Sequence, residues 1–328
     1  MSILADNDSV NVDVEWFKQP LLDAWYLSGP TASGKTQVAI PLAKRLGAEI
    51  ISLDSMAVYR GMDIGTAKPT GEILEDIPHH LISIVDPTED YSVSQFVIDA
   101  HRCAEEIRAR GRQVLFVGGT PLYLKTLLRG MFLGPPADWS FRKSVQKDVQ
   151  EFGIAALRAR LQQVDPLSAH RILPHDERRM TRALEVSMVT GKPLSHWQTQ
   201  FERVGSERCN RVFVLGWERD LLHQRVKERV ERMFGEGLMD EVKGLLEKYQ
   251  TLGRTAMQAV GYKEPIEYLH GRATLAETVE QVLIHTRQFV RRQEIWFRSI
   301  DEVRRISISR SGDLSKITEE ILGTTQPA

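Results

Sequence analysis

The chain has 328 residues, and its 43 Lys and Arg residues nearly balance 44 Asp and Glu residues, which leaves a formal net charge of −1. A content of 42% hydrophobic and 27% charged residues is that of a globular protein and excludes the disordered, collagen-like and coiled-coil classes. The near-zero charge gives no global sign of a nucleic-acid partner, although a local basic patch is enough to bind phosphates.

The sequence also bears on where the protein works. No run of about 18 apolar residues is present, so we expect no membrane partner. Residues 1–19 are acidic and lack the basic and apolar parts of a secretory signal. The two cysteines, Cys103 and Cys209, make neither a disulfide framework nor a zinc motif, which favours the reducing cytoplasm.

Short apolar runs alternate with helical patterns in the first part of the chain. After a predicted flexible extension at residues 1–22, strand-like runs occupy residues 24–27, 49–53, 80–85 and 114–117, and a fifth lies at 211–215. These runs are rich in β-branched side chains and end at Gly, Asp or Pro, as buried parallel strands do. Helical patterns at 37–46, 93–110 and 122–128 separate the early runs. The alternation predicts an α/β fold with a doubly wound parallel sheet.

The pattern changes after residues 134–136. Residues 141–200 contain no strand-like run, only amphipathic helical stretches such as 152–164 and 176–189, and the stretch from 220 to about 300 is helical again. We therefore predict a discontinuous core at 23–135 and 209–308, an all-helical insertion domain at 136–208, and a C-terminal tail at 309–328.

The strongest local motif follows the first predicted strand and opens the first predicted helix. The sequence GPTASGKT fits the pattern G-x-x-x-x-G-K-[ST] and consists of Gly29, Pro30, Thr31, Ala32, Ser33, Gly34, Lys35 and Thr36. Backbone N–H groups of such a loop and the helix N-terminus surround an anion, Lys35 reaches terminal phosphate oxygens, and Thr36 ligates Mg²⁺. The motif predicts a nucleotide- or diphosphate-binding core like that of the P-loop NTPases, although the loop recognises phosphates and not the base of ATP.

Other polar residues follow predicted strands at the edge where ligands bind in open α/β sheets. Asp54 can accept a proton or hold Mg²⁺ through water, or it can cap the next turn. Thr120 can donate to a phosphate oxygen, or it can begin a helix that continues at Pro121. Arg225 and Arg229 lie four residues apart on one helix face, where they can clamp a diphosphate or remain solvated.

Two segments combine basic and aromatic residues. Residues 285–298 carry four arginines among Phe289, Trp296 and Phe297, and residues 142–182 carry nine arginines and lysines in the predicted insertion. Basic residues beside stacking aromatics suit RNA, whereas each segment alone also fits a solvated helix face.

Taken together, these segments resemble the tRNA dimethylallyltransferases, also called tRNA isopentenyltransferases. The motifs that carry the resemblance cover residues 24–300 and are GPTASGKT (29–36), DSMAVYRGMDIGTAKP (54–69), HHLISIVDP (79–87), GGTPLY (118–123), RALEVSMVTG (182–191), VGYK (260–263) and TRQFVRRQEIWFR (286–298). The resemblance implies transfer of a dimethylallyl group from dimethylallyl diphosphate to N6 of the adenosine 3′ of the anticodon. This is position 37, in tRNAs that read codons beginning with U, and diphosphate is released.

The resemblance also implies residue roles, Mg²⁺ as cofactor and a tRNA anticodon stem-loop as partner of what we take to be a monomer. Lys35 and Thr36 would bind the diphosphate and the metal, Asp54 would accept the N6 proton, and Thr120 would bind a phosphate oxygen. Arg225 or Arg229 would clamp the leaving group, with Arg225 preferred. The implied tRNA contacts are Asp54, Ser55, Met56, Ala57, Thr120, Arg142, Arg178, Arg179, Met180, Thr181, Arg182, Met257, Gln258, Val260, Gly261, Tyr262, Lys263, Arg291, Arg292, Gln293, Trp296 and Arg298.

Three residues depart from the family pattern. Ala57 stands where the family usually has Gln, Arg178 where Gln is frequent, and Ser83 where Asp or Asn is usual, which affects the details of RNA recognition. Two other hypotheses fit part of the sequence: a P-loop kinase of a small metabolite or nucleoside with the insertion as its lid, and an NTP-gated RNA-binding module. The kinase hypothesis gives the basic aromatic segment at 285–298 no role.

Overall fold

The computed structural model describes residues 17–69, 71–198, 210–309 and 314–324. The chain divides into two compact units, one comprising residues 1–19 and 130–204 and the other comprising residues 20–129 and 205–328. In the described part of the chain, no helix is both long and apolar enough to cross a membrane.

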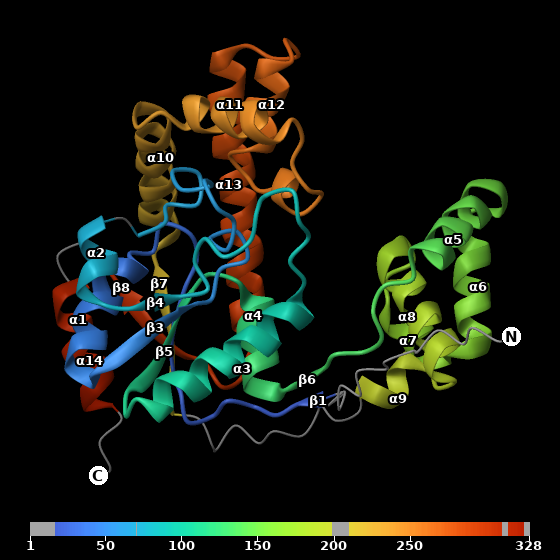
Figure 1. Cartoon of the computed structure of the whole chain (residues 1–328), viewed down its shortest axis with the longest axis horizontal. Coiled ribbons are helices and arrows are strands. Elements are labelled where there is room, and N and C mark those ends of the chain that lie inside the picture. The colour runs from blue at the N-terminus through green and yellow to red at the C-terminus, as the bar shows by residue number, and fades with distance from the viewer. Residues whose placement is uncertain (1–16, 70, 199–209, 310–313, 325–328) are drawn as a thin grey trace, which may run out of the picture. The chain divides into compact units, whose positions relative to one another are not determined.

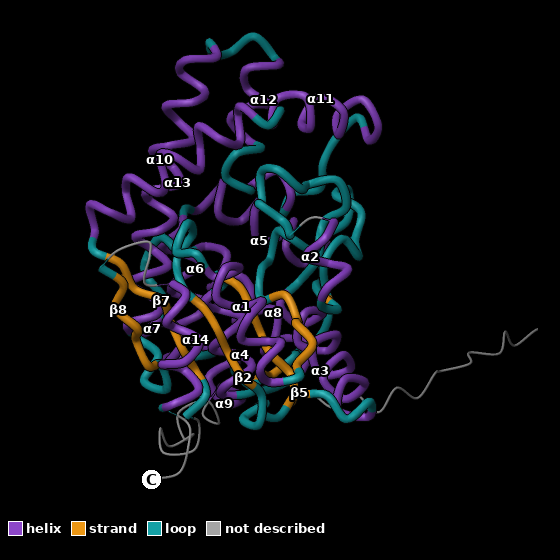
Figure 2. Tube along the Cα trace, turned by 90° about the vertical axis from the view of Figure 1, so that its left-hand side faces the viewer, coloured by secondary structure: helices purple, strands orange, loops and turns teal. Residues whose placement is uncertain are grey.

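The larger unit is built on a parallel six-stranded sheet (Figures 1 and 2). Its strand order is β4-β3-β5-β2-β7-β8. The strands are β2 (Trp25–Ser28), β3 (Ala48–Ser52), β4 (His79–His80), β5 (Gln113–Gly118), β7 (Val212–Trp217) and β8 (Arg304–Ile308). The helices are α1 (Lys35–Leu46), α2 (Gly71–Asp76), α3 (Val93–Ala109), α4 (Pro121–Arg129), α10 (Arg219–Gly235), α11 (Leu238–Tyr249), α12 (Lys263–Leu269), α13 (Leu275–Arg298) and α14 (Leu314–Gly323), with a 3₁₀ turn at Ala256–Gln258.

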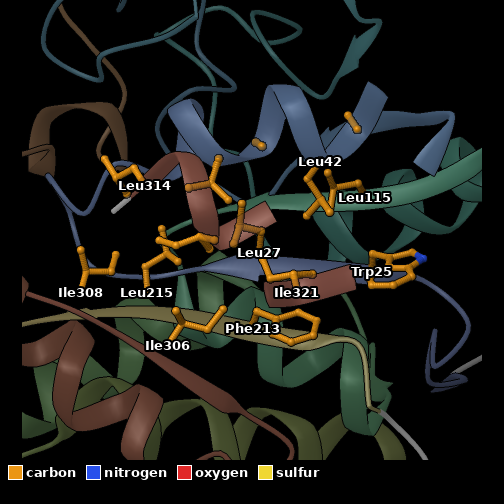
Figure 3. Packing of buried hydrophobic residues seen from close by; sticks show 14 of the residues in the cluster. Trp25, Leu27, Leu42, Leu115, Phe213, Leu215, Ile306, Ile308, Leu314 and Ile321 are labelled. Carbon is orange, nitrogen blue, oxygen red and sulfur yellow. The ribbon is translucent and has the colours of Figure 1, made fainter. Parts of the chain in front are cut away.

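Alternation along the strands gives each face of the sheet its own core. Leu27 of β2 packs against Leu42 of α1 and Ile321 of α14 on one face (Figure 3). Tyr26 points to the other face, where its ring stacks on Phe116 of β5 with centroids 5.0 Å apart. The helices α3 and α4 pack together in this unit, apart from the first core. The predicted parallel sheet is confirmed, and the long helices α10 and α13 extend beyond it to α11 and α12 (Figure 1).

Three sequence predictions in this unit need correction. The strand predicted at 80–85 is limited to His79–His80, because Leu81 and Ser83 adopt left-handed backbone conformations with φ of 59° and 52° that end the strand. The strand β8 was not predicted, since its alternating Arg304–Ile308 sequence follows a long helix without a turn signal. The predicted tail at 309–328 contains α14, whose residues Leu314, Ile317 and Ile321 are buried in the core.

The smaller unit contains a two-stranded antiparallel pair and five helices among its described residues. They are β1 (Phe17–Lys18), β6 (Met131–Phe132), α5 (Trp139–Phe152), α6 (Ile154–Val164), α7 (Pro166–Arg171), α8 (Glu177–Thr190) and α9 (Leu194–Gln198). The extension predicted at 1–22 is therefore structured at Phe17–Lys18, which pair with β6, and residues 1–16 lie outside the described chain. The predicted boundary at 208–209 lies outside it as well.

The helices of the smaller unit surround an apolar core and one buried carboxylate. The core includes Val145 of α5, Leu161 of α6 and Met180 of α8. Glu185 is fully buried and accepts two hydrogen bonds from Arg142, at 2.8 Å each, and one from Arg182 at 2.6 Å. Burial raises the pKa of Glu185, but the hydrogen bonds from the two arginines outweigh burial and hold it below its ordinary value.

Candidate active site

A cleft of about 700 Å³ opens where the central strands of the larger unit end. Its walls include the loop after β2, Asp54 after β3, Gly118 and Gly119 at the end of β5, and Arg225 and Arg229 on α10. In parallel sheets the carboxyl ends of the strands form the ligand crevice, and the sequence motifs meet here for that reason. The structure thus brings together the predicted phosphate loop, the predicted base and the predicted arginines.

The loop at residues 29–36 exposes a helix N-terminus to this cleft. Gly34 precedes α1 with φ of 86°, a conformation that favours glycine, and no side chain caps the helix. The free N–H groups and the helix dipole attract an anion. Lys35 donates from Nζ to the carbonyl oxygens of Gly29 at 3.0 Å and Pro30 at 2.9 Å, which holds its ammonium group over the loop.

The environment of Lys35 lowers the pKa of its ammonium group to about 8. Burial is the main cause, the neighbouring Arg229 adds to it, and Asp54 opposes both. Burial also lowers the pKa of Arg229, again opposed by Asp54. Two cations close together with one carboxylate leave an excess of positive charge in the cleft, which a diphosphate would neutralise.

Asp54 is held by backbone hydrogen bonds and also lines the cleft. Its Oδ1 accepts hydrogen bonds from the backbone N–H groups of Met56 at 2.8 Å and Ala57 at 3.3 Å, so it caps the turn that follows β3. The residue is half-buried and lines the cleft. A carboxylate has two oxygens, and capping through Oδ1 leaves Oδ2 for a ligand in the cleft.

Thr120 is tied to the segment after Asp54. Its Oγ1 accepts a hydrogen bond from the Ser55 N–H at 3.1 Å, and its own N–H donates to the Leu53 carbonyl oxygen at 3.1 Å. Gly118 must be glycine, because a Cβ there would lie 2.2 Å from the Leu53 carbonyl oxygen. The ends of β3 and β5 are therefore held at close distance, and Thr120 stands beside Ser55, next to the cleft-lining residues Asp54 and Gly119 in the chain.

The two candidate arginines differ in what they contact. The Nε of Arg225 donates to the Ala32 carbonyl oxygen at 2.8 Å, and its guanidinium lies 4.3 Å from the centroid of the Trp217 ring. Trp217 in turn donates from Nε1 to the Ser33 carbonyl oxygen at 2.9 Å. Arg225 and Trp217 thus support the backbone of the phosphate loop. Arg229 donates to the Thr66 carbonyl oxygen at 3.3 Å and interacts electrostatically with Lys35 and Asp54. Both arginines line the cleft, and the choice between them as the clamp stays a prediction.

Oxygen donors for a metal ion lie on the same cleft. Thr36 has an exposed side chain at the first turn of α1, and Asp54 lines the same cleft. Within the described residues, no group of three or more His, Cys, Asp or Glu side chains could hold a metal ion. The donors present fit Mg²⁺, which takes one or two protein oxygens and completes its shell with water and substrate phosphates.

The residues predicted to contact tRNA fall into exposed and buried sets. In the larger unit the exposed residues are Met257, Gln258, Lys263, Arg291, Arg292, Trp296 and Arg298. The buried residues are Ala57, Gly261, Tyr262 and Gln293, and those of intermediate exposure are Ser55, Met56, Thr120 and Val260. In the smaller unit Arg178 and Arg179 are exposed, and Met180 and Thr181 are buried. Arg142 and Arg182 are held by Glu185. Ala57, although buried, lines the cleft, and the contacts of the whole set with tRNA stay a prediction.

Glu241, which was not predicted from the sequence, supports one wall of the cleft. Its carboxylate on α11 accepts hydrogen bonds from the successive N–H groups of Asp63 at 2.9 Å, Ile64 at 2.7 Å and Gly65 at 3.3 Å. The buried Tyr262 hydroxyl donates to the same carboxylate at 2.6 Å. The next residues, 66–69, line the cleft. A lone Glu in a helix gives no sign of such a role, because its partners lie about 177 positions away.

Comparison with known proteins shows to which family the chain belongs. Residues 57–300 match the family described as IPP transferase. The chain belongs to this family. A relative from Rhodopirellula baltica, named tRNA dimethylallyltransferase, is 48% identical over 92% of this chain and 94% of its own length. A relative of the same name from Geobacter sulfurreducens is 42% identical over 90% of this chain and 96% of its own.

Solved structures of family members agree with the fold. The crystal structure of full-length tRNA isopentenylpyrophosphate transferase from Bacillus halodurans is 38% identical, with a TM-score of 0.66 over 92% of this chain and 96% of that chain. A eukaryotic dimethylallyltransferase, described in a crystallographic study of its action on tRNA, is 27% identical, with a TM-score of 0.76 over 93% of this chain and 80% of that chain. The family resemblance found in the motifs is confirmed, and the chain is a transferase enzyme.

Proposed function

We propose that this enzyme has a P-loop NTPase-like core and transfers the dimethylallyl group of dimethylallyl diphosphate to N6 of adenosine 37 in tRNAs that read codons beginning with U. The observation that carries the proposal is that the uncapped N-terminus of α1, Lys35 and Asp54 all line the same cleft. The names of the relatives give the transferred group and the tRNA acceptor, and the cleft fits both partners.

On the donor side, the loop and the two cations bind the leaving group. The N–H groups at the start of α1, the Lys35 ammonium and the Arg229 guanidinium surround the diphosphate and offset the charge that grows as the allylic C–O bond breaks. Arg225 acts at one remove, because it holds the Ala32 carbonyl and so the course of the loop. Thr120 lies at the rim, where its hydroxyl is positioned by Ser55.

On the acceptor side, Asp54 handles the proton. The exocyclic amine of adenine attacks the allylic carbon, a C–N bond forms as the C–O bond breaks, and diphosphate departs. The N6 proton passes to the Asp54 carboxylate, which is held in place by Met56 and Ala57. An adenosine buried in a stacked loop must leave the stack to reach this carboxylate.

Magnesium is the proposed cofactor. Thr36, and Asp54 through water, would hold the ion together with the diphosphate oxygens, and bound Mg²⁺ would neutralise part of the leaving-group charge. Exposed basic residues would contact the anticodon stem-loop, and they include Arg291 and Arg292 in the larger unit and, considered separately, Arg178 and Arg179 in the smaller one. The reaction belongs in the cytoplasm, where tRNA and the donor meet.

A labelling experiment separates this function from its two competitors. The protein is incubated with undermodified tRNA and ¹⁴C-labelled dimethylallyl diphosphate, and in parallel with γ-³²P-ATP and the same tRNA. We expect ¹⁴C on the adenosine 3′ of the anticodon and no transfer of ³²P. Transfer of ³²P would instead show a kinase, and binding of tRNA without any transfer would show an RNA-binding module. Either outcome overturns the proposal.

A further inference from the structure

The side chain of Gln293 joins two loops of the cleft from beneath. It lies on α13 and is 3% exposed. Its Oε1 accepts a hydrogen bond from the Thr31 N–H at 2.9 Å, and its Nε2 donates to the Gly119 carbonyl oxygen at 2.6 Å. One amide group thus ties the phosphate loop after β2 to the glycine pair at the end of β5.

The packing around Gly119 leaves no space between these loops. A Cβ at Gly119 would lie 2.8 Å from Gln293 Nε2, 3.3 Å from the Gly29 carbonyl oxygen and 3.6 Å from Lys35 Nζ. The Gln293 amide therefore sits beside the Lys35 ammonium group, at the point where the two loops touch. A shift of either loop would move the groups that face the diphosphate.

The chemistry of the position requires an amide of this length. Thr31 offers a donor and Gly119 offers an acceptor, and a neutral amide satisfies both at once. Loss of the amide would leave a part-buried N–H and a buried carbonyl without partners. The neighbouring Arg291 and Arg292 are exposed, so α13 presents its basic residues outward and this amide inward.

We propose that Gln293 is a positioning residue that sets the phosphate loop against the Gly119–Thr120 loop, so that Lys35 and Asp54 face the same donor molecule. The inference rests on the proposed function and deepens it. It replaces the interpretation of Gln293 as a tRNA contact, because both polar ends of the side chain are bonded inside the protein.

The test compares Gln293→Met, which keeps the length and loses both hydrogen bonds, with Gln281→Met at an exposed position of the same helix. We expect Gln293→Met to bind inorganic pyrophosphate, in the presence of MgCl₂, at least about ten-fold more weakly, since two buried bonds are lost. The kcat/KM for dimethylallyl diphosphate falls by a similar factor, the Kd for tRNA stays within about two-fold, and the amide of Thr31 exchanges faster with deuterium. Gln281→Met changes none of these quantities.

A further variant, together with measurements on the wild-type enzyme, keeps the outcomes separate. Gln293→Glu preserves size and polarity but faces the Gly119 carbonyl with a second acceptor, so it is expected to weaken pyrophosphate binding even if the Met variant does not fold. Unchanged pyrophosphate binding in the folded variants, or weaker tRNA binding with normal pyrophosphate binding, would overturn the inference. An inactive wild-type enzyme would refute the proposed function instead, while pyrophosphate affinity and amide exchange would still report on Gln293.

Discussion

At the scale of single residues, the cleft depends on side chains that do two things at once. Asp54 caps a turn through Oδ1 and keeps its other oxygen for the cleft, and Lys35 binds two loop carbonyls while its ammonium faces the ligand space. The structural and functional interpretations of Asp54 are therefore compatible. Because each of these side chains also has a structural contact, a substitution that tests its chemical role alone must preserve its shape.

The substitution Asp54→Asn tests the proposed base. The Asn oxygen can still accept from Met56 and Ala57, so the turn persists, but the side chain no longer accepts a proton. We expect turnover to fall by about 10²–10⁴-fold, the usual contribution of a general base, with the Kd for tRNA changed by no more than a few-fold. Single-turnover assays and filter binding measure the two quantities. Asp76→Asn on the surface serves as control, and near-normal turnover of Asp54→Asn would rule out this role.

The lowered pKa of Lys35 predicts a pH dependence of donor binding. With a pKa near 8 in the free protein, the amine loses its proton as pH rises through 8, and binding of an anion then requires protonation of the amine. The Kd for pyrophosphate should therefore be flat below about pH 7.5 and increase above pH 8. Titration calorimetry from pH 6.5 to 9.5 measures this. Lys35→Arg, whose guanidinium stays charged, should lose the dependence; the same rise in this variant would assign it to another group.

At the scale of elements, side chains on the helices α10, α11 and α13 form hydrogen bonds to the backbone of the segments around the cleft. Gln293 on α13 supports the phosphate loop, Arg225 on α10 supports its carbonyls, and Glu241 on α11 gathers the N–H groups of residues 63–65. The helix α14 closes the core beneath α1, where Leu314 lies next to Gly34. The contact between Leu314 and Gly34 shows that α14, which lies far from the motifs in the sequence, packs against the phosphate loop.

The substitution Ile321→Ala tests the contribution of α14. Ile321 is fully buried in the core of the sheet, so loss of its methylene and methyl groups leaves a cavity. We expect the free energy of unfolding of the larger unit to fall by about 2–5 kcal/mol. Urea denaturation followed by far-UV circular dichroism measures the change. The exposed Lys316→Ala on the same helix should stay within about 0.5 kcal/mol; an equally small effect of Ile321→Ala would show that α14 does not contribute to the core.

At the scale of the whole molecule, the net charge of −1 hides a separation of charge. Acidic residues of the N-terminal segment and the core offset exposed arginines on α8 and α13. A phosphate backbone responds to the local surface within a Debye length of about 10 Å, not to the chain total. The balance of charge is therefore compatible with an RNA partner.

The double variant Arg178→Ala and Arg179→Ala tests this view. If both guanidiniums contact phosphates, tRNA binding weakens and the slope of log K against log salt becomes shallower by about 2, which is about 1 for each contact. Electrophoretic mobility shifts between 50 and 300 mM KCl measure both. Lys44→Ala, on a lysine paired with Asp76 in the larger unit, provides the control. An unchanged slope would remove these residues from the RNA surface.

Much of this architecture could be predicted from the local sequence, and the reasons are physical. Strand and helix periodicities are local, so the order of the elements from β2 to α4 apart from the short helix α2, the helical stretch at 141–198 and the position of Asp54 after β3 could be predicted. The loop GPTASGKT was predicted because its glycines answer a local backbone requirement. The strand at 80–85 was overestimated, since the backbone conformations of Leu81 and Ser83 depend on tertiary contacts with residues 57 and 58.

Only the tertiary structure decided which side chains work together. Gln293 lies 262 positions from Thr31, and Arg225 lies 193 positions from Ala32, so no sequence window contains either pair. The sequence by itself determined the parallel α/β fold and the family, and it predicted the phosphate loop. Tertiary packing gave Arg225 and Arg229 different hydrogen-bond partners and buried Gln293 between two loops, because burial and hydrogen-bond partners depend on how the whole chain packs and not on its local pattern.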